Sequence, residues 1–196
     1  LCDNVIDAVK NEVKMIIILY DTDFSEDKLV MPMAMVIGRL NLALLKANVR
    51  HLASMIAVTG EVVDSHSAAV LIGYGASAIY PSLLFSSVIK LVKESSVMKM
   101  DCNDALKSVH TALNGGLMKI MSKMGIATIA SYRNTGLFDI MGLNEEIVRD
   151  CFETSNCALS GLGYADIEER LKKNHKEAYD NSGFNKIFPL NIGGFY

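Results

Sequence analysis

One uninterrupted apolar run near the start of the chain restricts the folds that this sequence can adopt. The run lies in VKMIIILYD, residues 13–21, and has the length of a strand with charged residues near both ends. Such runs are typical of strands in parallel sheets that are covered on both faces. A helical period of apolar residues over 2–13 precedes it. We therefore expect a helix and then a buried strand at the start of an α/β fold.

Helical and strand patterns keep alternating along the next part of the chain. Pro32 can open a helix, because the missing N–H of a proline would be unbonded there in any case. Asp64 or Ser65 can cap a later helix, which Gly73 or Gly75 would end. We expect further strands at 52–60, 77–80 and 126–132, and further helices at 31–48, 81–95 and 103–124. This order predicts βαβ units in a mostly parallel sheet of about four strands, with helices on both faces, in a Rossmann-like or barrel-related fold.

The pattern changes from Thr135 onward to shorter segments. We expect the pieces at 136–143 and 145–152 and a charged helix at 166–179 to pack on the edge of the sheet. Residues 181–196 are rich in glycine and have no clear period, so they read as an extended connector toward a downstream domain. We therefore assign 1–180 to a partial α/β domain. The start at Leu1 and the apolar end suggest that both ends are cuts through a longer protein.

Charge, hydropathy and cysteine spacing argue against several classes of protein. Nineteen basic and 22 acidic residues give a net charge of −3 without a long run of one sign, so nucleic acid is an unexpected partner. The uncharged stretch 65–89 is long enough for a membrane span, but glycines, a proline and repeated serines interrupt it. The four cysteines lack C-x-x-C spacing and no secretory signal is visible, which favours free thiols in the cytoplasm.

One glycine motif suggests a nucleotide site. Residues 73–78, GYGASA, match the dinucleotide fingerprint G-x-G-x-x-G/A, and Glu94 stands near the distance expected for a ribose ligand. The fingerprint requires a strand before it and a helix after it, whereas the residues before Gly73 look helical. The interpretation that we favour is a glycine that ends a helix in a left-handed conformation.

Two further groups of residues have a functional and a structural interpretation. Glu61, Asp64 and His66 follow a strand, at the edge where open α/β sheets bind ligands. The interpretation that we favour is that Asp64 and Ser65 cap a helix and leave His66 in solvent. The methionines at 118, 121 and 124 share a helical face, for which core packing is the usual role. We find no G-x-S-x-G, P-loop or H-E-x-x-H motif, and the dispersed histidines indicate no metal cluster.

At this point the residues carry a family resemblance. The first part of the match consists of Thr59-Gly60-Glu61, His66, residues 71–76 (LIGYGA), Ala78-Ile79 and Pro81. The second part consists of residues 116–126 (GLMKIMSKMGI), Ser131-Tyr132-Arg133, Phe138, Gly142-Leu143, residues 160–163 (SGLG), His175, Ala178 and residues 193–196 (GGFY). In this order they resemble the central domain of the large subunit of glutamate synthase from about residue 52 to the end. Departures at Val62, Val63, Ser67, Tyr80 and 156–158 remove charges and amides and leave the apolar spacing intact.

The resemblance implies a role within a larger enzyme that converts glutamine, 2-oxoglutarate and a reductant into two molecules of glutamate. It implies a noncatalytic central domain that links a glutaminase domain to an FMN domain and helps to wall the ammonia tunnel between them. FMN and the [3Fe-4S] cluster would be bound by other parts of the full-length enzyme, and this chain would bind neither cofactor. The partners would be these neighbouring domains and a small reductase subunit. The alternatives are a stand-alone nucleotide or small-ligand module built on Gly73–Ala78 and a pure interaction domain.

We also expect a polar surface that faces the neighbouring domains. Glu61 and Tyr132 each follow a predicted strand, so their loops would gather at the carboxyl edge of one sheet. The expected contact residues are Glu61, His66, Lys119, Lys123, Ser131, Tyr132 and Arg133.

Overall fold

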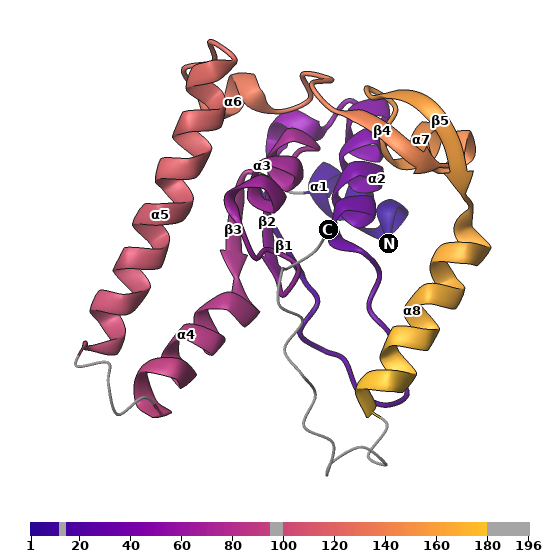
Figure 1. Cartoon of the computed structure of the whole chain (residues 1–196). Helices are drawn as coiled ribbons and strands as arrows, with labels where there is room; N and C mark the ends of the chain where they lie inside the picture. The colour runs from indigo at the N-terminus through magenta and orange to yellow at the C-terminus, as the bar shows by residue number, and fades with distance from the viewer. Residues whose placement is uncertain (12–14, 95–99, 180–196) are drawn as a thin grey trace.

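The computed structural model describes residues 1–11, 15–94 and 100–179. The predicted connector at 181–196 lies outside the described residues. The elements are α1 (Cys2–Asn11), β1 (Met15–Tyr20), α2 (Met33–Lys46), the 3₁₀ turn η1 (Arg50–Leu52), β2 (Ala53–Thr59), α3 (Ser65–Gly73), β3 (Ala78–Pro81), α4 (Ser82–Glu94), α5 (Cys102–Lys123), α6 (Ile129–Tyr132), β4 (Asp139–Leu143), α7 (Glu145–Cys151), β5 (Asn156–Leu162) and α8 (Tyr164–Tyr179). Figure 1 shows their arrangement.

A parallel three-stranded sheet in the order β1-β2-β3 forms the centre of the molecule. Helices α2 and α3 connect successive strands, which confirms the predicted βαβ organisation and the α/β class. The sheet is not closed into a barrel. A second parallel sheet contains β4 and β5 with an irregular register, so the described residues form five strands in two sheets.

The main core lies between one face of this sheet and the helices that follow its strands. Ile17 of β1 and Met55 of β2 are buried on that face together with Ile37 and Leu40 of α2 and Leu71 of α3. Alternate residues of a strand point to opposite faces, so this face is the covered one. Among the described residues, helices do not cover the other face of β1, where Ile16 and Ile18 are exposed. On this second face α4 contacts β2, and its Phe85 ring packs edge-on against Tyr80 of β3, so the face is covered in part.

Helix α3 begins and ends where the sequence predicts. The Asp64 carboxylate accepts a hydrogen bond from the Ser67 amide at 2.7 Å, and the Ser67 hydroxyl completes a capping box. After the helix, Gly75 has φ = +129°, a backbone angle that residues with a Cβ rarely adopt. The helix-ending interpretation of Gly75 is confirmed.

The predicted strand at 126–132 is wrong, because the segment forms the single helical turn α6. The Thr128 side chain accepts a hydrogen bond from the Ser131 amide and caps this turn. Ile129 and Tyr132 of α6 are three residues apart, which places them on one side of the turn. Together with Ile126, which precedes the turn, they pack with Met121.

Helix α7 packs against α2 at a point where only glycine fits. A Cβ at Gly38 would overlap the carbonyl oxygen of Cys151 and lie 3.3 Å from the Phe152 ring.

Strand β5 was not expected, since its residues are mostly small or polar and exposed along nearly the whole strand. The second sheet therefore carried no periodic signal.

The long helices α4 and α5 pack against each other and extend to one side of the central sheet (Figure 1). The predicted core face of methionines is correct only for Met121, because Met118 is 70% exposed and Met124 is 44% exposed. In the described part of the chain no helix is both long enough and apolar enough to cross a membrane. All four cysteines are free thiols.

Candidate functional site

The face of the central sheet opposite the main core carries exposed apolar side chains, and α4 covers it only in part, where the Phe85 ring packs against Tyr80. Ile16 is 66% exposed, Ile18 57%, Tyr20 63% and Tyr80 50%. The parallel register places Ile18 beside Ile56, Tyr20 beside Val58 and Val58 beside Tyr80. These side chains therefore form one continuous apolar surface, which we call the open sheet face. Parallel sheets are normally covered on both faces, so this surface has the character of an interface.

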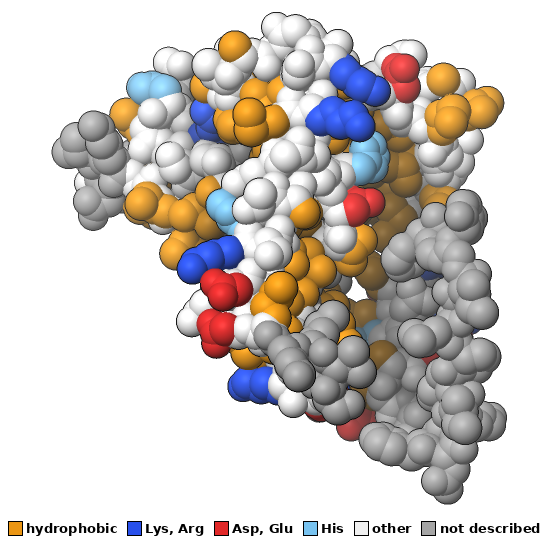
Figure 2. Space-filling model, turned by 60° about the vertical axis from the view of Figure 1, so that its left-hand side comes forward, with side chains coloured by type: hydrophobic (Ala, Val, Ile, Leu, Met, Phe, Trp, Pro, Cys, Tyr) orange, Lys and Arg blue, Asp and Glu red, His pale blue; other side chains and the backbone are white. Residues whose placement is uncertain are grey.

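Exposed apolar side chains continue onto the neighbouring helices. Leu83 and Leu91 of α4 and Met118 and Met124 at the far end of α5 are among the exposed large hydrophobic residues. Figure 2 shows hydrophobic side chains gathered between charged ones over the side of the molecule that carries α4 and α5. Exposed patches of this kind mark contact surfaces for other proteins or domains.

Glu61 has a structural role at the carboxyl end of β2. Its two carboxylate oxygens accept hydrogen bonds from the Met33 amide at 3.0 and 3.1 Å, at the start of α2, where the Pro32 cap has no side-chain hydrogen bond. Partial burial raises the pKa of Glu61; the Met33 amide opposes this shift and the nearby Asp21 adds to it. Asp21 accepts hydrogen bonds from the Gly60 amide and the Thr59 hydroxyl. These contacts connect the loop after β1 to the loop after β2.

His66, Lys119 and Lys123 lie on the outer surface of the packed pair α3 and α5. All three side chains are exposed, and neither lysine forms an ion pair with a residue that the structure describes. The two helices can approach closely because Gly116 has no side chain; a Cβ at this position would overlap the Ser65 side chain. Contact of His66, Lys119 and Lys123 with a neighbouring domain stays a prediction.

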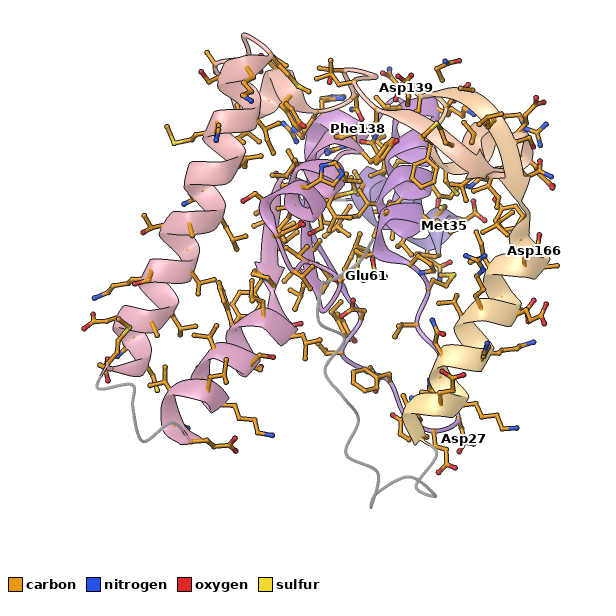
Figure 3. All side chains as sticks on the ribbon, in the orientation of Figure 1. Asp27, Met35, Glu61, Phe138, Asp139 and Asp166 are labelled. Atoms are coloured by element: carbon orange, nitrogen blue, oxygen red, sulfur yellow. The ribbon has the colours of Figure 1, made fainter. Side chains whose placement is uncertain are left out.

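Arg133 lies at the other end of the sheet from Glu61. Its Nη1 donates to the Ser77 hydroxyl at 3.0 Å, directly before β3, whereas Glu61 follows the carboxyl end of β2. Figure 3 shows Glu61 well below Phe138, which lies in the loop shortly after Arg133. The structure therefore does not bring the seven predicted contact residues to one edge of the sheet. The expectation that they would meet there assumed a strand at 126–132, and this segment forms α6 instead.

Ser131 and Tyr132 have different positions within α6. The Ser131 hydroxyl is exposed and bonds to the Thr128 hydroxyl at 2.8 Å. The Tyr132 side chain has no exposed surface and packs beside Ile72 and Met121 within this chain. Its contact with a neighbouring domain stays a prediction.

The glycine motif at 73–78 is oriented the wrong way for a dinucleotide. It follows helix α3 and precedes strand β3, whereas phosphate binding requires a strand before the glycines and a helix amino terminus after them. Gly73 serves helix packing, since a Cβ there would overlap the Phe138 ring. A nucleotide site at this motif is not favoured.

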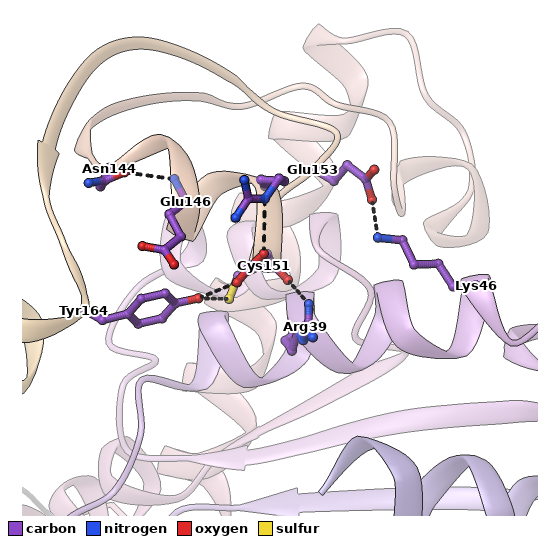
Figure 4. Close-up of polar contacts among 9 residues, drawn as sticks. Arg39, Lys46, Asn144, Glu146, Cys151, Glu153 and Tyr164 are labelled. Atoms are coloured by element: carbon purple, nitrogen blue, oxygen red, sulfur yellow. Dashed lines mark hydrogen bonds and ion pairs between the residues drawn. The ribbon is translucent and has the colours of Figure 1, made fainter.

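A separate groove of about 680 Å³ lies between α2 and α8. It is lined mainly by apolar side chains, among them Met31, Met35, Ile167 and Leu171. At its rim, the Tyr164 hydroxyl lies 3.9 Å from the Cys151 sulfur and donates to Asp150 at 3.4 Å (Figure 4). Burial raises the pKa of the Cys151 thiol, which disfavours the reactive thiolate.

The described residues contain no group of three or more His, Cys, Asp or Glu side chains that could hold a metal ion.

The open sheet face was not predicted from the sequence, because the run in β1 is apolar at every position and does not distinguish a covered face from an open one. The register of the sheet is the observation that reveals it.

Comparison with known proteins agrees with the resemblance seen in the sequence. The family model described as glutamate synthase central domain matches residues 1–144. The NADPH glutamate synthase large chain of Azospirillum brasilense is 31% identical over 180 residues, which are 92% of this chain and 12% of that relative. The ferredoxin-dependent glutamate synthase 2 of Synechocystis is 32% identical over 188 residues, 88% of this chain and 12% of that relative.

A more distant relative gives the same picture. The NADH glutamate synthase of Schizosaccharomyces pombe is 28% identical over 193 residues, which are 97% of this chain and 9% of that protein. The chain thus spans only 9 to 12% of the length of these relatives. It belongs to the glutamate synthase central domain family.

Proposed function

We propose that this chain acts as the noncatalytic central domain of a glutamate synthase large subunit. It would link the glutaminase domain to the FMN domain and help to wall the ammonia tunnel between them. The complete enzyme would convert glutamine, 2-oxoglutarate and a reductant into two molecules of glutamate. Family membership and the relatives that contain this segment support the proposal.

Domain limits, cofactors and location are part of the same proposal. Residues 1–180 would form the domain and 181–196 the connector toward the FMN domain. FMN and the [3Fe-4S] cluster would be bound elsewhere in the large subunit, and a small reductase subunit is a further proposed partner. We place the enzyme in the cytoplasm on the cysteine usage of the chain.

The observation that carries the linking role is the open sheet face. Full burial of one large apolar side chain stabilises a structure by about 1.5–3 kcal/mol, and Ile16, Ile18 and Tyr20 all remain exposed here. Covering this surface by an adjacent part of the longer protein would supply the packing that parallel sheets usually have. We therefore propose that a neighbouring domain covers the open sheet face.

The polar contact residues fit this proposal in a reduced form. His66, Lys119, Lys123 and Ser131 are exposed and would contact neighbouring domains directly. Glu61 and Arg133 would act through the loops that they hold, since each already bonds within the chain. A nucleotide-binding function is not favoured, because residues 73–78 lead from a helix into a strand and not from a strand into a helix.

The proposal is tested by Ile18→Glu in the complete protein. The isolated chain should keep its melting temperature, because Ile18 is exposed and surface substitutions usually change stability by less than about 0.5 kcal/mol. In the complete enzyme a carboxylate would be buried at the domain contact, which costs about several kcal/mol. We expect more glutamine to be hydrolysed for each glutamate formed by reductive synthesis.

Leu159→Glu provides the matched control, because Leu159 is 64% exposed against 57% for Ile18 but lies on β5 in the other sheet. Its ratio of glutamine hydrolysed to glutamate formed should equal that of the unmodified enzyme. The linking role of the open sheet face would be refuted if Ile18→Glu also left this ratio unchanged.

A further inference from the structure

Two arginines face the same hollow at the amino end of the central sheet. Arg50 lies in η1, directly before β2, and Arg133 follows α6. The hollow has a volume of about 290 Å³ and is also lined by His51, Asn48 and Asn134. Figure 1 shows α6 at the top of the molecule, at the opposite end from the arrowhead of β3.

Arg50 is held in place by uncharged acceptors. Its Nε donates to the Asn41 side-chain oxygen at 2.7 Å, Nη2 donates to the Gly75 carbonyl at 2.8 Å, and Nη1 donates to the Ala53 carbonyl. Burial lowers the pKa of Arg50, and the positive charge of Arg133 lowers it further. The guanidinium is therefore held in place and partly buried, but none of these bonded partners carries a negative charge.

Arg133 has even fewer partners. Its Nη1 donates to the Ser77 hydroxyl, while its buried Nε has no acceptor within the part of the chain that the structure describes. Across residues 1–11, 15–94 and 100–179, no carboxylate lies within ion-pair distance of either guanidinium. Two neighbouring positive charges without a counter-charge are unfavourable at a partly buried position.

The backbone around the hollow is well defined. Asn48 has φ = 57° and Asn134 has φ = 58°, and they are the only non-glycine residues with positive φ in the described residues. Asn134 is held at both its side chain and its backbone: its side-chain oxygen accepts from Asn41 at 2.7 Å, and its amide donates to the Gly73 carbonyl at 2.8 Å. The arginines thus project from a scaffold that loses little entropy on binding.

The carboxyl end of α2 also borders this hollow and carries a partial negative charge. Its last carbonyls are already bonded, since the Asn48 amide donates to Leu45 at 2.9 Å and the Val49 amide donates to Leu44 at 3.0 Å. A partial charge of about half an electron does not balance two guanidinium groups.

We propose that this hollow is a binding site for a small free oxyanion, a phosphate or a carboxylate, held between Arg50 and Arg133. Guanidinium groups bind both chemical types with strong, charge-assisted hydrogen bonds. His51 also lines the hollow, where a ring N–H would add a donor. The site is separate from the open sheet face.

The test is isothermal titration calorimetry of the 196-residue chain with inorganic phosphate and with malonate, at constant ionic strength. We expect saturable binding of at least one anion at one site per chain. Arg133→Gln should weaken binding by at least about tenfold, since it removes one of two charges. Arg170→Gln is the matched control, because it removes the same charge from the exposed face of α8 and should leave binding unchanged.

A second variant guards against loss of folding in Arg133→Gln. His51 is exposed, so His51→Glu should preserve the fold and place a repelling carboxylate in the lining of the hollow. Circular dichroism checks folding, and binding of whichever anion the unmodified chain binds should be lost. The proposal is overturned if the unmodified chain shows no saturable heat up to about 10 mM anion, or if Arg170→Gln weakens binding as much as Arg133→Gln.

Discussion

Replacement of Gly75 by alanine should destabilise the chain by about 3 kcal/mol. The backbone alone contributes about 1–2 kcal/mol, because φ = +129° is strained for any residue with a Cβ. In addition, the new Cβ would lie 2.7 Å from the Asn41 side-chain oxygen and 3.0 Å from its Cβ. Asn41 is only 3% exposed, so its side chain is enclosed by other residues.

The second contribution comes from the bonds that Asn41 makes. Its amide group accepts from Arg50 and donates to Asn134, so any shift that relieves the overlap breaks at least one of these hydrogen bonds. Leaving a buried hydrogen-bonding group unpaired costs about 1–3 kcal/mol. The sum of backbone strain and one lost bond gives the expected value.

Urea unfolding followed by circular dichroism measures this change. Gly115→Ala is the control, because nothing lies within 4 Å of a Cβ there and the residue is inside α5. That variant should be stabilised by about 0.5–1 kcal/mol through helix propensity. A loss below about 1 kcal/mol for Gly75→Ala would refute the reasoning, since the strained backbone alone should exceed it.

Two further predictions concern packing and pH. Gly38→Ala should lower the melting temperature strongly, because the added methyl group overlaps the Cys151 carbonyl and separates α2 from α7; an unchanged melting temperature would show that the helices can move apart freely. Because the folded state raises the pKa of Glu61, it holds this proton more tightly than the unfolded chain, so the stability contribution of Glu61 should fall as the pH rises above 4.5. Melting temperatures measured at increasing pH above 4.5 should decline less in Glu61→Gln than in the unmodified chain. An identical decline would contradict the raised pKa of Glu61 in the folded state.

The central βαβ units could be predicted because their signals are local. The run in β1, the cap at Asp64 and the glycine at position 75 each specify one element through its own residues. The segment at 126–132 could not be assigned reliably, since a single turn such as α6 contains too few residues to separate a helical period from an apolar run. Strand β5 has mostly exposed residues, so no apolar pattern marked it.

The candidate site could be predicted only where it depended on exposure of polar residues. His66, Lys119 and Lys123 are charged or polar residues on helices, and their exposure follows from that chemistry. Glu61 and Arg133 were placed together by assuming two neighbouring strands, and the absence of a strand at 126–132 removed the basis for this assumption. Arg50 and Arg133 meet through tertiary contacts that no local pattern encodes.

The composition of β1 is itself an argument about the surroundings of this domain. In a strand that keeps one face in solvent, the outward positions are usually polar, and the sequence alternates. Ile16, Ile18 and Tyr20 occupy the outward positions of β1, and none of them is charged. Three large apolar side chains in a row on a solvated edge strand would promote aggregation, which natural sheets avoid with charged residues. These three exposed side chains are the observation behind the covering contact that we propose above, and Ile18→Glu tests that proposal.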